Sequence, residues 1–93
     1  MSLEEIKGKT AAILERYPIR KAAIFGSFAR GNNRNDSDLD ILVEADDSLS
    51  LLDFVGIKGD LEDVLGRKVD LVEYDTIKPR IRESVLANTV QLL

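Results

Sequence analysis

Cysteine and histidine are both absent from the 93-residue sequence. Their absence excludes a disulfide framework, a thiol nucleophile, an imidazole base and an ordinary zinc site. Any bound metal ion must therefore be held by oxygen atoms, which favours magnesium, manganese or calcium. The sequence also lacks an apolar run long enough to span a membrane, and its first residues lack the apolar stretch of a signal peptide. We therefore expect a cytoplasmic protein that makes no contact with a membrane.

Positive charge is also in short supply. The chain has 13 lysines and arginines against 17 aspartates and glutamates, which gives a formal net charge of -4. A general nucleic-acid surface needs a basic stripe that neutralises phosphates, so we expect no direct binding of nucleic acid. A bound nucleotide stays compatible with this charge, because a metal ion can bridge phosphates and carboxylates. The length and the 44% content of hydrophobic residues fit one domain, residues 1–93.

Hydrophobic periodicity and turn residues divide the chain into helices and strands. Short apolar or alternating runs predict strands at residues 21–26, 38–44 and 68–74. The predicted helices begin after capping or turn residues, at Ser2, Ser27, Ser50 and close to Pro79. This order predicts an α/β (α+β) domain, with a small mixed sheet of three to four strands and helices packed mainly on one face.

Apolar side chains at helical spacing predict the core faces of the helices. In the helix that follows Ser50, the apolar positions are Leu51, Phe54, Val55, Leu61, Val64 and Leu65. In the last helix they are Ile77, Ile81 and Val85, which we assign to the core rather than to a docking surface. Gly66 stands where the C-cap of the longer helix is expected.

The stretch GSFARGNNRNDSDLD, residues 26–40, ends in aspartates directly before the most apolar strand. Side chains alternate across a strand, so Asp38 and Asp40 point to the same face. Two neighbouring carboxylates stay ionised only in water or with a cation between them. One interpretation is a solvated strand start after a turn that Asp36 caps. The other is a metal site.

Gly26 and Ser27 stand at the other end of this stretch, directly after an apolar run. Glycine lets the backbone turn tightly and approach a ligand closely. Ser27 begins a short helix, whose free N–H groups can bind an anion of phosphate size. If strands 21–26 and 38–44 are neighbours, the anion site and the carboxylate pair meet at one edge of the sheet.

In this stretch Gly-Ser is followed, after ten residues, by Asp-x-Asp. In this spacing the sequence resembles the nucleotidyltransferase superfamily that includes DNA polymerase beta. The segment KVDLVEYD, residues 68–75, resembles the strand that carries the third carboxylate of that family. With IKPRIRESVL, residues 77–86, the resemblance covers nearly the whole chain and is closest to the minimal nucleotidyltransferases (MNT-type antitoxins) of prokaryotic toxin–antitoxin pairs. It implies a fold like the palm of these enzymes.

The resemblance also implies a set of site residues. The catalytic carboxylates of the family correspond to Asp38, Asp40 and Asp70, and its phosphate-binding turn corresponds to Gly26 and Ser27. Carboxylates beside a nucleoside triphosphate repel one another unless cations lie between them. The resemblance therefore implies two magnesium ions, with manganese as an alternative, held by the three aspartates, and ATP as the substrate.

Two of the implied assignments have alternatives. Asp70 would complete the second metal site and could accept the proton of the attacking hydroxyl, but it could also be a charge on an edge strand. Arg30 could steady the triphosphate, but an exposed arginine after a turn is often a solvated charge.

For this small subfamily, the resemblance implies transfer of AMP from ATP to a hydroxyl, usually that of a tyrosine, on a HEPN-type toxin. The chain would then be the antitoxin of a type VII-like toxin–antitoxin pair. Two other functions stay open: a non-catalytic antitoxin that acts by occlusion, and an aminoglycoside-type nucleotidyltransferase that modifies a small molecule. The complete set of motif residues favours catalysis, and the absence of a second domain disfavours a small-molecule pocket. The sequence is compatible with a homo-oligomer or a hetero-oligomer.

Overall fold

The computed structural model describes residues 2–31 and 38–93. At its centre is a four-stranded sheet with the strand order β3-β2-β1-β4. The strands are β1 (Ile19–Phe25), β2 (Leu39–Ala45), β3 (Val69–Glu73) and β4 (Val90–Gln91). Strand β1 is antiparallel to both of its neighbours, β2 and β4, whereas β2 and β3 run parallel. The predicted fold class, a small mixed sheet with helices, is confirmed.

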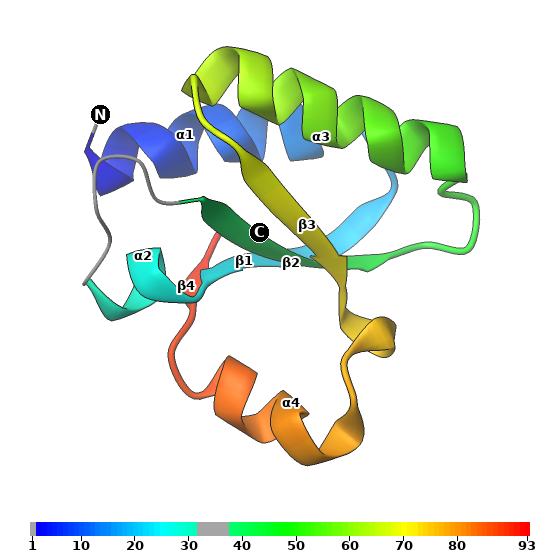
Figure 1. Cartoon of the computed structure of the whole chain (residues 1–93). Coiled ribbons are helices and arrows are strands. Elements are labelled where there is room, and N and C mark those ends of the chain that lie inside the picture. Colours follow the sequence, from blue (N-terminus) through cyan, green and yellow to red (C-terminus); the bar gives the residue numbers. More distant parts are fainter. Residues whose placement is uncertain (1, 32–37) are drawn as a thin grey trace.

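The helices are divided between the two sides of this sheet (Figure 1). Helices α1 (Leu3–Leu14) and α3 (Leu51–Leu65) lie side by side over one face, which we call the covered face. Helix α4 (Pro79–Leu86) lies on the opposite side, which we call the open face. The short helix α2 (Ser27–Arg30) follows β1, and a 3-10 turn, η1 (Tyr74–Thr76), follows β3. None of the described helices is long and apolar enough to cross a membrane.

The two long helices begin where their capping residues predict. The backbone N–H of Glu5 donates to the side chain of Ser2 at 3.2 Å. Ser50 and Asp53 exchange two such bonds, at 3.1 and 3.2 Å, and so form a complete capping box. Gly66 ends α3 in the left-handed conformation, with a φ of 64°. Local sequence therefore determines the ends of the helices that cover the sheet.

The hydrophobic core lies between the covered face and the two long helices. Leu39, Ile41 and Val43 of β2 have no exposed surface. They belong to one cluster with buried residues of both helices, which are Ile6, Ile13 and Leu14 from α1 and Ile57, Leu61 and Leu65 from α3. The core thus fixes strand β2 from one side, whereas Asp40 and Glu44 on its other side keep part of their surface exposed.

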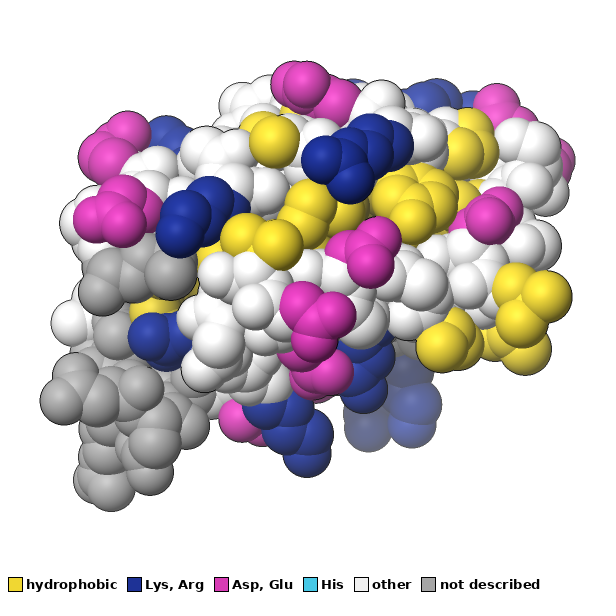
Figure 2. Space-filling view, turned by 90° about the horizontal axis from the view of Figure 1, so that it is seen from above, with side chains coloured by type: hydrophobic (Ala, Val, Ile, Leu, Met, Phe, Trp, Pro, Cys, Tyr) yellow, Lys and Arg dark blue, Asp and Glu magenta, His cyan; other side chains and the backbone are white. Residues whose placement is uncertain are grey.

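The prediction of core positions in α3 is wrong for three residues. Leu51, Val55 and Val64 are 79%, 59% and 43% exposed, whereas Ile57, which the pattern did not single out, is fully buried. Apolar side chains are spread around this helix, so more than one stripe fits a helical spacing, and only the contact with the sheet selects one. Figure 2 shows apolar side chains at the surface on the side of α1 and α3.

The C-terminal part of the chain also differs from the prediction. Every residue of α4 keeps part of its surface exposed, and Ile81 is 48% exposed, so its assignment to the core is wrong. Ile77 is buried, but it lies before the helix. Strand β4 was not predicted. It pairs with Ala23 and Ile24 of β1 and returns the end of the chain to the sheet.

Candidate active site

Gly26 connects β1 to α2 through a backbone conformation that other residues avoid. Its φ is 74° and its ψ is -147°, a combination found almost only at glycine. A Cβ atom added here would overlap Oδ2 of Asp40 and would lie 3.2 Å from its Cγ. Gly26 therefore turns the chain into α2 and also lets the backbone lie directly against the carboxylate of Asp40.

Asp40 lies in β2 between the two neighbouring strands. It is the register partner of Phe25 in β1 and of Asp70 in β3. Neighbouring strands are about 4.8 Å apart, and register partners point to the same face, so Asp40 and Asp70 are adjacent on the open face. Asp38 directly precedes β2 and is exposed, as is Asp70, whereas Asp40 is half-buried. The structure therefore brings Gly26 and the three predicted aspartates to one edge of the sheet.

The charges around Asp40 act on one another. Burial raises the pKa of Asp40 above its ordinary value of 3.8, and the negative charges of Asp70 and Asp38 raise it further. The positive charge of Arg30 acts in the opposite direction, which shows that this exposed arginine lies within electrostatic reach of the carboxylate. The three carboxylates form one electrostatic group, and a bound cation would relieve their repulsion.

The same carboxylates supply the donors that a hard cation prefers. Magnesium binds through carboxylate oxygens and usually keeps several waters and substrate phosphates as further ligands. Within the described parts of the chain, however, no three acidic side chains are arranged so that they could hold a metal ion as they stand. The type of donor and the register of Asp40 and Asp70 fit magnesium.

Two further residues that the sequence analysis singled out, Ser27 and Asp36, have different outcomes. Ser27 is the first residue of α2 and is half-buried, so the predicted short helix is confirmed. The amide of Arg30 donates to the carbonyl of Gly26 at 3.1 Å, which closes this helical turn. Asp36, predicted to cap the turn before β2, lies outside the described residues.

Arg67 is a neighbour of this site that sequence reasoning did not single out. Its guanidinium lies over the ring of Phe28 in α2, 4.8 Å from the ring centroid. Phe28 is 8% exposed and belongs to the core cluster. The contact joins the segment before β3 to helix α2, which follows Gly26. An arginine directly after a helix C-cap carries no signal in the sequence that would predict this stacking.

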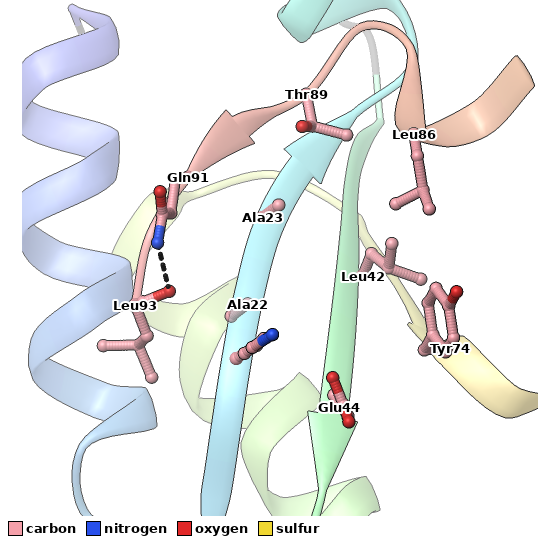
Figure 3. A pocket seen from close by; sticks show the side chains of 10 residues that line it. Ala22, Ala23, Leu42, Glu44, Tyr74, Leu86, Thr89, Gln91 and Leu93 are labelled. Carbon is pink, nitrogen blue, oxygen red and sulfur yellow. Dashed lines mark hydrogen bonds between the residues drawn. The ribbon is translucent and has the colours of Figure 1, made fainter. Parts of the chain in front are cut away.

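A pocket of about 450 Å³ opens on the same face of the sheet as Asp40. Figure 3 shows that Leu42 of β2, Tyr74 of η1 and Leu86 of α4 form one wall of it. Lys21 and Glu44, which are register partners, line it as well. The pocket could not be found from the sequence, because its lining comes from five elements, β1, β2, η1, α4 and β4, that are spread along the chain.

Comparisons with known proteins find similar proteins over most of the chain. The family described as "Polymerase beta, Nucleotidyltransferase" matches residues 8–93. Protein adenylyltransferase MntA of Thermococcus cleftensis is 39% identical over 94 residues, which cover 97% of this chain and 95% of that protein.

Solved structures share the fold over nearly the whole chain. A protein provisionally described as a minimal nucleotidyltransferase matches with a TM-score of 0.84 and 40% identity, over 97% of this chain and 95% of that one. A toxin–antitoxin structure with AMP-PNP matches with a TM-score of 0.80 and 26% identity, over 94% of this chain and 72% of that one.

Proposed function

The chain belongs to the polymerase beta nucleotidyltransferase family, and on that premise we propose that it transfers AMP from ATP to a hydroxyl group of a partner protein. The observation that carries the proposal is the contact between the two halves of the motif. The backbone of Gly26 lies against the carboxylate of Asp40, and Asp40 is in register with Asp70. The turn predicted to bind phosphate and the group of carboxylates thus lie at the same end of the strands.

The proposed reaction is an in-line displacement at the α-phosphorus of ATP. A bond forms between the acceptor oxygen and the α-phosphorus, the bond from that phosphorus to the bridging oxygen breaks, and pyrophosphate leaves. Gly26, Ser27 and the first N–H groups of α2 hold the leaving phosphates, and Arg30 adds positive charge beside them. Asp70, which is exposed on the edge strand, accepts the proton of the acceptor hydroxyl.

The proposal includes divalent cations because the carboxylates of the site and the triphosphate of ATP, which are all negatively charged, must come close together. The residues that would hold them are Asp38, Asp40 and Asp70, and magnesium is the favoured ion. When bound, the ions supply charge neutralisation and Lewis-acid stabilisation of the transferring phosphoryl group. The raised pKa of Asp40 supports this role, since burial and the neighbouring negative charges destabilise its carboxylate and a nearby cation would stabilise it.

The partner is proposed to be a HEPN-type toxin, with this chain as its antitoxin. Two findings support it: the MNT-type resemblance of the sequence, and the match to a toxin–antitoxin structure with AMP-PNP. A partner that holds its hydroxyl group beside the carboxylates would raise the effective concentration of the acceptor at the α-phosphorus. Neutralisation by occlusion alone is the second candidate, and the same experiment tests it.

The experiment is intact mass spectrometry of the cognate toxin after incubation with this protein, ATP and magnesium. We expect a gain of one or more AMP units that is lost with Asp38→Asn and with Asp40→Asn. Asp63→Asn, the same chemical change at an exposed position of α3, is the matched control and should transfer AMP as the wild type does. No gain of mass, together with a complex that inhibits the toxin without nucleotide, would establish occlusion instead.

A further inference from the structure

One short segment lies between the parts of the candidate site that come from different elements. Residues 66–68 connect α3 to β3, the strand that carries Asp70. The carbonyl of Lys68 accepts a hydrogen bond of 2.9 Å from the N–H of Leu39, the residue directly before Asp40. In Figure 1, α2 lies at the same end of the sheet as the starts of β2 and β3. The segment is therefore placed to join α2 to the carboxylates.

The backbone of this segment is held at both of its ends. Gly66 ends α3, and its N–H donates to the carbonyl of Glu62 at 2.9 Å. At the other end, the N–H of Val69 donates to a carboxylate oxygen of Glu62, also at 2.9 Å. Val69 has no exposed surface and belongs to the core cluster. Arg67 lies between these two anchors, so its side chain extends from a fixed backbone.

Helix α2, in contrast, is too short to hold its own position. It has four residues, and the glycines on either side of it, Gly26 and Gly31, both have a positive φ. A single helical turn is not stable by itself, because its hydrogen bonds do not offset the loss of backbone freedom. Phe28 is the only buried residue among the four, so its ring attaches α2 to the rest of the domain. The guanidinium of Arg67 lies over that ring, 4.8 Å from the centroid.

A displacement of α2 would alter the candidate site directly. Phe28 is two residues after Gly26, whose backbone lies so close to the carboxylate of Asp40 that an added Cβ atom would overlap it. Misplacement of a binding group by about 1 Å can lower a reaction rate about 100-fold. The contact that holds the ring of Phe28 therefore affects how the turn at residues 26–27 meets the carboxylates.

We propose that Arg67 is a positioning residue, which holds the turn at residues 26–27 against the carboxylates through its stacking on Phe28. The inference rests on the proposed function and adds to it a residue that acts without contacting the nucleotide. Arginine suits this role because its planar guanidinium stacks on an aromatic face and is always charged. Lysine at this position keeps the charge but loses the planar contact.

A double-mutant cycle tests whether Arg67 acts through Phe28. The probe is the ATP analogue α,β-methylene-ATP with magnesium. Arg67→Lys should raise its Kd about three- to tenfold, the size expected for the loss of one stacking contact. In the background of Phe28→Leu, which keeps an apolar side chain in the core, Arg67→Lys should have no further effect. An equal loss in both backgrounds would show that Arg67 acts without Phe28 and would overturn the inference.

The matched control is Arg82→Lys, because Arg82 makes the same kind of contact elsewhere. Its guanidinium lies over the ring of Tyr74, also 4.8 Å from the centroid. This stacking joins α4 to η1 rather than to α2. Arg82→Lys should therefore lower the melting temperature about as much as Arg67→Lys but leave the Kd as in the wild type. A Kd that rises equally in both variants would indicate a general loss of stability and overturn the positioning role.

Hydrogen exchange, measured by NMR without nucleotide or partner, separates this inference from the proposed function. The amide of Arg30 donates to the carbonyl of Gly26 at 3.1 Å, so its exchange rate reports how firmly the turn is held. We expect exchange about threefold faster or more in Arg67→Lys and unchanged exchange in Arg82→Lys. If this result is found while the wild type transfers no AMP, the proposed function fails and the positioning role stands. Unchanged exchange in Arg67→Lys would overturn the positioning role, whether or not AMP is transferred.

Discussion

Alternate residues of strand β2 face opposite sides of the sheet, and the two sides differ in what covers them. Leu39, Ile41 and Val43 point under α1 and α3 and have no exposed surface. Asp40 and Glu44 point to the open face and are half-buried. One strand of seven residues thus serves the core on one side and the candidate active site on the other. The covered side packs against the helices, whereas the open side carries carboxylates that repel one another.

Asp40 on the open face and the apolar residues of the covered face contribute to stability with opposite signs. Burial of an apolar side chain on the covered face stabilises the fold, by roughly 1.5–3 kcal/mol for a residue of this size. On the open face, burial and the charges of Asp70 and Asp38 raise the pKa of Asp40, so its ionised form is disfavoured by the fold. The comparison predicts that changes on the covered face alter stability and that changes on the open face alter function.

The largest effect is expected from Ile41→Ala on the covered face. Ile41 has no exposed surface and packs between β2 and the helices, so its truncation leaves a cavity. We expect a loss of about 2–5 kcal/mol in the free energy of unfolding. Urea denaturation followed by circular dichroism measures it. A loss of nucleotide binding at full stability would contradict the division between the two faces.

Gly26→Val is expected to have the next largest effect, on AMP transfer. The backbone at Gly26 has a φ of 74°, which valine resists, and the added side chain would overlap Asp40. Transfer should fall at least about 100-fold, because both the phosphate turn and the carboxylate are displaced. Ser27→Ala is the comparison variant, since it removes one hydroxyl and keeps the backbone donors. Its loss should stay below about tenfold. An inactive Ser27→Ala beside a fully active Gly26→Val would reverse these two roles.

The smallest effect is expected from Asp40→Asn on the stability of the metal-free protein. Because the pKa of Asp40 is raised in the folded state, its ionisation costs stability at any pH above the ordinary value of 3.8. Below that value the carboxyl is protonated in both the folded and the unfolded state, and the cost disappears. In EDTA at pH 7, Asp40→Asn should therefore melt at the temperature of the wild type or a few degrees above it. The difference should vanish near pH 3. A variant that melts well below the wild type at pH 7 would show that Asp40 supports the fold.

Much of the fold follows from local signals in the sequence. The capping residues Ser2 and Ser50 and the C-cap Gly66 mark helix ends that the structure confirms. The alternation in residues 38–44 identifies both faces of β2. The predictions that failed concern long-range packing. Contacts between elements decide which stripe of α3 is buried and whether Ile81 of α4 is buried. The periodicity of the sequence gives no information about those contacts. Strand β4 has only two residues and is visible only through its pairing with β1.

The features of the candidate site likewise fall into those that the sequence predicts and those that depend on long-range packing. The spacing of Gly26, Ser27, Asp38 and Asp40 predicts that the two halves of the motif meet, and the structure places Gly26 against Asp40. Asp70 lies next to Asp40 because β2 and β3 pair in parallel with these two residues in register. The pocket on the open face could not be predicted, since elements from both ends of the chain build it. The roles of these residues in catalysis remain predictions.

The most direct test of the proposed site is isothermal titration calorimetry with magnesium α,β-methylene-ATP. In this ATP analogue the link between the α- and β-phosphorus atoms cannot be broken, so AMP cannot be transferred. The wild type and the control Asp63→Asn should bind it with the same Kd. Asp40→Asn should bind it more than about 100-fold more weakly. Loss of a residue that only hydrogen-bonds to a metal ligand already lowers metal affinity by about 10–100-fold, and Asp40 is proposed to be a ligand itself. The unfolding transition of this variant should stay intact. Binding by Asp40→Asn with the Kd of the wild type would place the nucleotide away from the open face and contradict the account.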